Sequence, residues 1–163
     1  MIRKVFLAFL FSQLFATHLQ AQDSLTNKKE KKIVSVKSQV ENKDFVFEAR
    51  YAIPFGGQMR YLTDYYSLKI VHDSLIVYLP YFGRAYTAPM DPMNIAIDIT
   101  STNFEYTSKP LKKGGWDITI KPKDQPGVQV FNLSVYDNGK AYLNVTNTDR
   151  DPISYNGSLE EKK

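Results

Sequence analysis

Apolar and polar residues alternate with a period of two along most of the chain after residue 44, and short turn sequences separate the alternating runs. Successive side chains of a strand point to opposite faces of a sheet, so each run predicts a half-buried β-strand. The clearest hairpin signal is Asn138-Gly139, which is followed by the alternating run 140–145. Asn and Gly tolerate positive φ best, and a type I′ turn needs positive φ at both central residues. This pair therefore predicts a two-residue type I′ hairpin.

The alternating runs together predict eight or nine strands. They fall at residues 45–53, 65–71, 75–79, 95–99, 104–107, 116–121, 128–136, 140–145 and 153–159. Tight turns join antiparallel neighbours, whereas parallel strands need long crossover connections. We therefore expect a mostly all-β fold over residues 44–160: one antiparallel meander that closes as a sandwich or a partly open barrel.

A helical period precedes the predicted sheet. Ile33, Val36 and Val40 recur at three- and four-residue steps, which predicts a short amphipathic helix that ends near Asn42. The lysine-rich run 28–32 lies before these residues and is typical of a solvated linker. An anion-binding arm, or attachment to a membrane surface, is the alternative interpretation of that run. Linker and helix together occupy residues 22–43.

Residues 1–21 have the three parts of an export signal. Arg3 and Lys4 precede the apolar run 5–11, and a more polar stretch leads to the small residue Ala21. The apolar run is shorter than the roughly 20 residues that a membrane-spanning helix needs. We expect cleavage after Ala21, export to the periplasm or the cell exterior, and no transmembrane segment afterwards. An uncleaved N-terminal helix is the alternative.

The distribution of charge argues against a nucleic-acid partner. The chain has 21 Lys and Arg against 17 Asp and Glu, a net charge of +4. Residues 1–21 carry +2 of this, residues 22–43 carry +3, and residues 158–163 are neutral, which leaves −1 on residues 44–157. A nearly neutral body lacks the basic face that binds DNA or RNA.

Residue types that perform catalysis or bind metals are scarce. The chain has no cysteine, and His72 is its one histidine once residues 1–21 are removed. A zinc site needs three or four nitrogen or sulfur ligands, and a catalytic relay needs its base between nucleophile and orienter, which consecutive His72-Asp73-Ser74 cannot provide. Asp149 and Asp151 flank Arg150 and indicate a turn with a local ion pair rather than a calcium loop. We expect no catalytic residue, no metal and no cofactor.

The candidate binding residues lie in an aromatic loop after the run 75–79. Seven of the 11 tyrosines fall between residues 51 and 86, and tyrosine suits both strand packing and wet recognition surfaces. The candidates are Tyr81, Phe82, Arg84 and Tyr86, with Arg84 placed to reach an acidic partner. Gly83 between them predicts a tight backbone path. A purely structural role for the loop is the alternative.

Five further residues are expected to act structurally: Trp116, Asn138, Gly139, Arg150 and Tyr155. Trp116 begins a strand, and Asn138 and Gly139 form the predicted hairpin turn. We expect Arg150 to bond backbone carbonyls near the last strand and Tyr155 to support the fold there, because buried backbone polar groups need partners.

Several segments resemble one family of proteins. The most distinctive is Tyr78-Leu79-Pro80-Tyr81-Phe82-Gly83-Arg84-Ala85-Tyr86, and the others are residues 45–49, 73–75, 113–116, 139–143 and 150–157. In this order they resemble the DUF4251 family, which consists of small exported proteins of Bacteroidetes-type bacteria without an established function. The resemblance covers residues 33–159 and implies export and an all-β body with an N-terminal extension. It assigns no catalytic or ligand-binding residue.

Two functional hypotheses follow from these patterns. The first is an exported β-sheet module of the cell envelope that binds an unknown ligand or protein, chiefly through the aromatic loop. The second is a carboxylate-based hydrolase of envelope glycans, which requires a cleft with two carboxyl groups about 5–10 Å apart.

Overall fold

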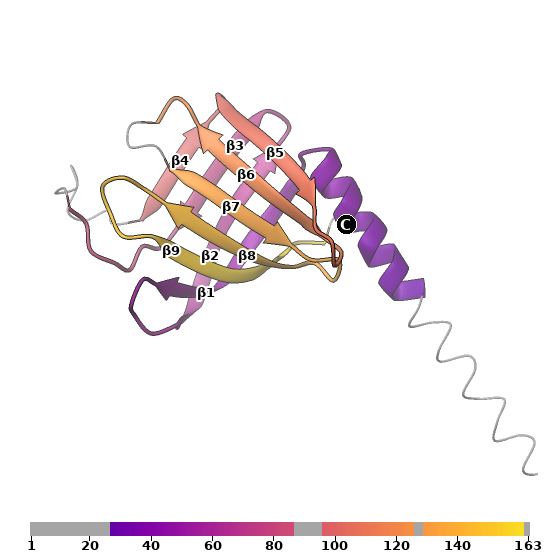
Figure 1. The fold of residues 1–163 in the computed structure, drawn as a ribbon, viewed down its shortest axis with the longest axis horizontal. Coiled ribbons are helices and arrows are strands. Elements are labelled where there is room, and N and C mark those ends of the chain that lie inside the picture. The colour runs from indigo at the N-terminus through magenta and orange to yellow at the C-terminus, as the bar shows by residue number, and fades with distance from the viewer. Residues whose placement is uncertain (1–26, 87–95, 126–128, 162–163) are drawn as a thin grey trace, which may run out of the picture.

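The computed structural model describes residues 27–86, 96–125 and 129–161 (Figure 1). A helix over residues 27–41 is followed by nine strands. They are β1 (Phe45–Pro54), β2 (Arg60–Val71), β3 (Ser74–Leu79), β4 (Ile97–Ser101), β5 (Phe104–Pro110), β6 (Trp116–Pro122), β7 (Val130–Val135), β8 (Lys140–Thr146) and β9 (Ile153–Leu159). The predicted export signal lies outside the described residues and stays a prediction.

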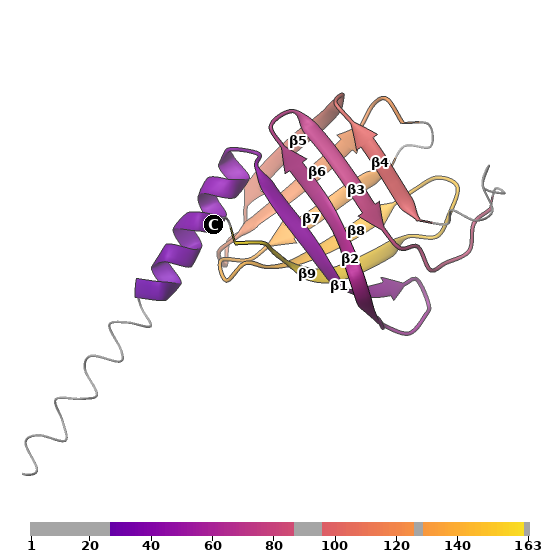
Figure 2. The same cartoon turned by 180° about the vertical axis from the view of Figure 1, so that it is seen from behind.

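The nine strands form one antiparallel sheet in the order β4-β3-β2-β1-β9-β8-β7-β6-β5. Strands β1–β4 make one layer and β5–β9 the other, and the strands of the two layers cross steeply (Figures 1 and 2). Pairing of β9 with β1 joins the two halves, with Phe47 opposite Leu159 and Pro54 opposite Ile153. The sheet curls into a nearly closed barrel, and strands β4 and β5 form its two edges. This confirms the predicted antiparallel meander.

The core fills the space between the two layers. Inward-facing positions of β3 and β4 are buried and alternate with exposed ones, as the period-two pattern requires. Phe47 and Leu68 from one layer and Phe131 and Leu143 from the other are fully buried. Trp116, at the start of β6, is half-buried and packs against this core. Side chains rather than an open lumen therefore occupy the barrel interior.

The helix over residues 27–41 packs across one end of the barrel. Val36 and Val40 are buried, and the Tyr106 hydroxyl of β5 donates to the Val40 carbonyl at 3.0 Å. The helix ends close to the expected Asn42 but begins earlier than the period indicated, because the lysine run 28–32 is helical rather than a linker. Lysine is a good helix former, and Lys32 is anchored by an ion pair with Glu161 at 2.7 Å. Within the described residues, no helix has the length and apolar character that crossing a membrane would require.

The β7–β8 hairpin forms where predicted, but its turn type differs. Gly139 has φ +80°, whereas Asn138 is not among the non-glycine residues with positive φ, so the turn is not type I′. The Gly139 amide donates to the Tyr136 carbonyl and the Tyr136 amide to the Lys140 carbonyl. This is a three-residue loop in which a type I turn precedes a left-handed residue. The Asn138 side chain accepts the Lys140 amide, a local bond that the residue pair alone did not reveal.

Candidate functional site

The aromatic loop after β3 is fastened to the connection between β8 and β9. Tyr86 donates its amide to the Asp149 carbonyl at 2.7 Å, and Asp151 donates its amide to the Arg84 carbonyl at 3.0 Å. Ala85 and Arg150 form an isolated antiparallel bridge between the same two segments. Residues 80–86 are thus held by backbone pairing at the barrel end that lies away from the helix (Figure 1).

Tyr81 is the centre of this attachment. Its ring is 5% exposed, and its hydroxyl lies 3.0 Å from the carbonyl oxygens of both Arg84 and Asp151. Burial raises the pKa of the Tyr81 hydroxyl, and the nearby Asp151 carboxylate raises it further. A β-carbon on Gly83 would collide with the Tyr81 hydroxyl, so only glycine lets the loop pass this close to the ring. Tyr81 therefore holds the loop in place.

Tyr155 and Arg150 contact the loop from the β8–β9 side of the barrel. The fully buried Tyr155 hydroxyl donates to the Pro80 carbonyl at 2.7 Å. The Arg150 guanidinium lies 5.0 Å from the centre of the Tyr81 ring, and its Nε lies 3.6 Å from an Asp149 carboxylate oxygen. Two tyrosine hydroxyls thus bond the carbonyls of Pro80, Arg84 and Asp151, and the carbonyl bonds that we expected from Arg150 stay a prediction. A planar guanidinium is weakly hydrated and stacks readily on an aromatic face, which explains its position.

The remaining predicted binding residues are more accessible. Phe82 is half-buried beneath the Arg60 guanidinium, which lies 4.8 Å from the ring centre. Arg84 and Tyr86 are exposed, and the Tyr86 hydroxyl donates to the Asp151 carboxylate. That hydrogen bond raises the pKa of the Tyr86 hydroxyl. Of these four loop residues, only Arg84 and Tyr86 are exposed to solvent.

Large apolar side chains are also exposed at the tip of the β1–β2 hairpin. Phe55 is 73% exposed, Met59 is 59% exposed and Tyr61 is 63% exposed. Tyr51 and Tyr61 pack edge to face with ring centres 5.3 Å apart. Arg60, between Met59 and Tyr61, connects the hairpin to the loop through its contact with Phe82. We call the two neighbouring groups together the aromatic end; the hairpin contributes Tyr51, Phe55, Met59 and Tyr61, and the loop contributes Phe82, Arg84 and Tyr86.

The sequence pattern did not single out Phe55 or Met59, because both lie in a segment that it marks only as a break between strands. The signal was nevertheless present: Phe55 stands directly before Gly56-Gly57, and Met59 follows shortly after. Turn segments usually consist of Gly, Pro, Asn, Asp and Ser. The alternating strand pattern gives no packing reason for large apolar residues in such a segment.

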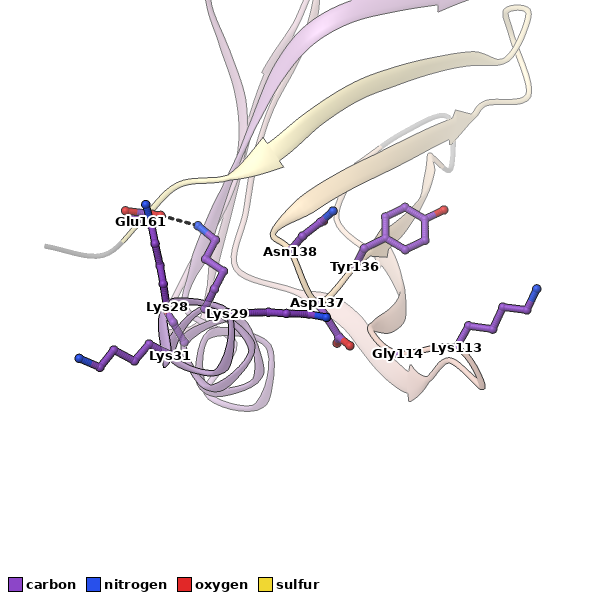
Figure 3. A pocket seen from close by; sticks show the side chains of 11 residues that line it. Lys28, Lys29, Lys31, Lys113, Gly114, Tyr136, Asp137, Asn138 and Glu161 are labelled. Atoms are coloured by element: carbon purple, nitrogen blue, oxygen red, sulfur yellow. Dashed lines mark hydrogen bonds and ion pairs between the residues drawn. The ribbon is translucent and has the colours of Figure 1, made fainter. Parts of the chain in front are cut away.

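A groove of about 860 Å³ lies at the opposite end of the barrel, between the helix, the β5–β6 turn and the β7–β8 turn (Figure 3). Its charged lining consists of five lysines and two acids: Lys28, Lys29, Lys31, Lys32, Lys113, Asp137 and Glu161. The helix contributes four of these lysines, and Lys113 comes from the β5–β6 turn. Segments far apart in the sequence therefore build one basic groove.

The lysines of the groove differ in how far they are neutralised. Lys32 donates to Glu161 at 2.7 Å, and this hydrogen bond, followed by the charges of Lys32 and Lys28, lowers the pKa of the Glu161 carboxyl. In Figure 3 the Lys29 side chain extends toward Asp137, whereas Lys31 and Lys113 point away from the other labelled side chains. Among the described residues, Lys29, Lys31 and Lys113 form no ion pair.

The carboxyl groups of the described chain bear on the glycosidase hypothesis. Three of them have a pKa that departs clearly from its ordinary value, Glu105, Asp124 and Glu161, and in each case it is lowered. The proton donor of a glycosidase needs a raised pKa and a second carboxyl group across a cleft, and that hypothesis stays a prediction. Within residues 27–86, 96–125 and 129–161, no three His, Cys, Asp or Glu side chains are grouped to hold a metal ion.

These features define a small, nearly closed antiparallel barrel with a helix across one end and the aromatic end at the other. The chain belongs to the DUF4251 family, a domain of unknown function, whose model matches residues 27–159. Its fold is similar to the crystal structure of a DUF4251 family protein from Bacteroides eggerthii DSM 20697, with a TM-score of 0.60 and 15% identity over 80% of this chain and 87% of that one. No curated protein matches the chain. The family resemblance read from the sequence is therefore confirmed.

Proposed function

We propose that this protein is an exported binding module of the cell envelope and that its aromatic end contacts the partner. The observation that carries the proposal is the exposure of Phe55, Met59 and Tyr61 on one hairpin tip. Single exposed apolar residues are ordinary, but a group of large ones at one place marks an interaction surface.

The composition of the aromatic end supports this role. Its exposed side chains are tyrosine, phenylalanine, methionine and arginine, the types enriched in the centre of protein interfaces. Tyr81 and Tyr155 hold the neighbouring loop through their hydroxyl bonds. A surface that is ordered before binding loses less conformational entropy when the partner arrives.

Export is supported by the sequence of residues 1–21, which has a basic start, an apolar run and a small residue at the cleavage point. An exported protein without cysteine obtains no stability from disulfide bonds. The packed core between the two layers supplies the stability instead.

One experiment tests both halves of the proposal. Tagged protein is expressed in its native host, and its envelope partners are captured by crosslinking and identified. We expect the recovered chain to begin at Gln22, and we expect Phe55→Ala with Tyr61→Ala to lose the component that the unaltered protein captures. Tyr136→Ala, which removes an exposed tyrosine at the other end, should retain it.

Recovery of the chain from the cytoplasm with an intact N-terminus would contradict export. Equal capture by the two tip substitutions and by Tyr136→Ala would contradict binding at the aromatic end. A circular dichroism spectrum of each variant shows whether a variant that no longer captures the partner is still folded.

A further inference from the structure

We propose that the groove between the helix and the two turns binds a phosphate-type anion. This site lies at the opposite end of the barrel from the aromatic end and does not depend on the proposed function. Its ligand is a small molecule or headgroup that carries one or more phosphate groups.

Charge is the first argument. Five lysines line the groove against two acids, whereas residues 44–157 as a whole carry a net charge of −1. Among the described residues, Lys29, Lys31 and Lys113 form no ion pair, although Lys29 extends toward Asp137 (Figure 3). A groove lined by an excess of cations attracts anions, and a bound anion neutralises part of that excess charge.

Rigidity is the second argument. The lysines are not on a free arm, because buried Val36 and Val40 fix the helix against the barrel. Lys32 packs against the turn at Gly139, where a β-carbon would lie 2.7 Å from its Cε. Lys113 belongs to a turn closed by the Gly114 amide, which donates to the Leu111 carbonyl at 3.2 Å. The backbone positions of the lysines are thus set before a ligand binds.

Size is the third argument. The groove volume of about 860 Å³ falls within the 300–1,000 Å³ that is typical of small-molecule sites. A phosphate group is much smaller than this, so the ligand has room for a further part such as a sugar or a glycerol unit. Tyr136 and the Gly114 backbone supply less polar surface at the same groove.

Glu161 acts in this site as a carboxylate that the ligand must displace. It holds Lys32 at 2.7 Å, yet its own side chain is 78% exposed. An exposed ion pair contributes little stability, so a ligand phosphate replaces the carboxylate at Lys32 without a large loss. Removal of this carboxylate should therefore strengthen anion binding, a result that loss of a structural contact would not produce.

The binding test titrates pyrophosphate into the protein as it is recovered from cells. Amide NMR follows the titration at two salt concentrations. We expect saturable shifts at Ser35, Gly114 and Asn138, which line the groove, and weaker binding at higher salt because salt screens exposed charges. The second arm is co-sedimentation with phosphatidylglycerol vesicles, with phosphatidylcholine vesicles for comparison. Vesicle binding that pyrophosphate inhibits indicates a lipid headgroup, and pyrophosphate binding alone indicates a soluble phosphorylated ligand.

Three matched pairs of variants locate the site. Lys29→Gln should weaken pyrophosphate binding by about fivefold, as expected for one lysine near a charged surface, while Lys37→Gln on the same helix should change it by less than about twofold. The neighbouring pair Lys113→Gln and Lys112→Gln should differ in the same way. Glu161→Gln should strengthen binding by about fivefold, whereas Glu160→Gln, whose carboxylate accepts the Tyr65 hydroxyl, should not.

Absence of saturable shifts at the groove amides overturns the proposal. So does an equal loss of affinity within the lysine pairs, because that result indicates general attraction by the net charge. Unchanged or weaker binding by Glu161→Gln also overturns it. Amide spectra of each variant without ligand report whether the fold is intact, so these outcomes stay distinct from unfolding.

Discussion

Single residues of the aromatic loop show how closely the fold depends on individual atoms. Gly83, Tyr81 and Tyr155 form one unit: the missing β-carbon admits the Tyr81 hydroxyl, and the Tyr155 hydroxyl bonds the Pro80 carbonyl. Their residue types suggested a tight loop and a buttress. The partners of each hydroxyl did not follow from the sequence, because they lie up to 75 positions away along the chain.

Tyr155 leads to a prediction about alkaline pH. Burial raises the pKa of the Tyr155 hydroxyl, and the nearby Tyr81 raises it further. An unfolded chain releases this proton near pH 10 whereas the folded protein keeps it, so the stability that depends on it is complete below pH 10 and is lost as pH rises. Each pH unit above 10 should then lower the free energy of unfolding by about 1.4 kcal/mol for this tyrosine.

Tyr155→Phe should remove this tyrosine's share of the alkaline loss of stability, which urea denaturation between pH 7 and 11 measures as a smaller slope. At pH 7 the variant should lose about 2 kcal/mol, because the buried Pro80 carbonyl is left without its donor. Tyr61→Phe removes an exposed hydroxyl and should change stability at pH 7 by less than about 0.5 kcal/mol. Equal alkaline slopes for the unaltered protein and Tyr155→Phe would contradict the assignment.

At the scale of elements, the N-terminal helix was predicted from three apolar residues, but its length was not. Ile33, Val36 and Val40 mark the face that packs on the barrel. The lysines before them carry no such period, so their helical state depends on good helix propensity and on contacts with Gly139 and Glu161. Those contacts join residues from opposite ends of the chain.

The helix also supplies a matched pair for a stability prediction. Val36 is 1% exposed and Val34 is 66% exposed, so the same substitution has opposite consequences two residues apart. Val36→Ala should lower the free energy of unfolding by about 2 kcal/mol through lost packing. Val34→Ala should raise it by a few tenths of a kcal/mol, about the difference in helix propensity. Denaturant titration measures both, and equal effects would show that the helix does not pack as described.

At the scale of the whole molecule, the pairing of β1 with β9 joins strands β1–β4 and β5–β9 into one nearly closed barrel. Both strands are hydrogen-bonded on both sides, whereas β4 pairs only with β3 and β5 only with β6. Strands with few neighbours open locally at lower free energy than central strands do. The barrel should therefore open from its edges.

Hydrogen exchange in the native state tests this order. Bonded amides of β1 and β9 should exchange at least about tenfold more slowly than bonded amides of β4 and β5. The β3 amides that bond to β2 provide an internal reference, because they belong to the same layer as β4 and lie one strand from the edge. Uniform protection across all nine strands would contradict opening from the edges.

The sequence by itself determined the strands, their antiparallel order along the chain and the family. These properties follow from local rules: alternation sets which face is buried, and tight turns set which strands are neighbours. Tertiary structure alone decided that β9 closes on β1, that the Tyr81 and Tyr155 hydroxyls bond the loop carbonyls, and that the lysines of the helix meet Lys113 across a groove. Each of these joins residues distant in the chain, and no local pattern encodes which distant partner will satisfy a buried polar group or neutralise a charge.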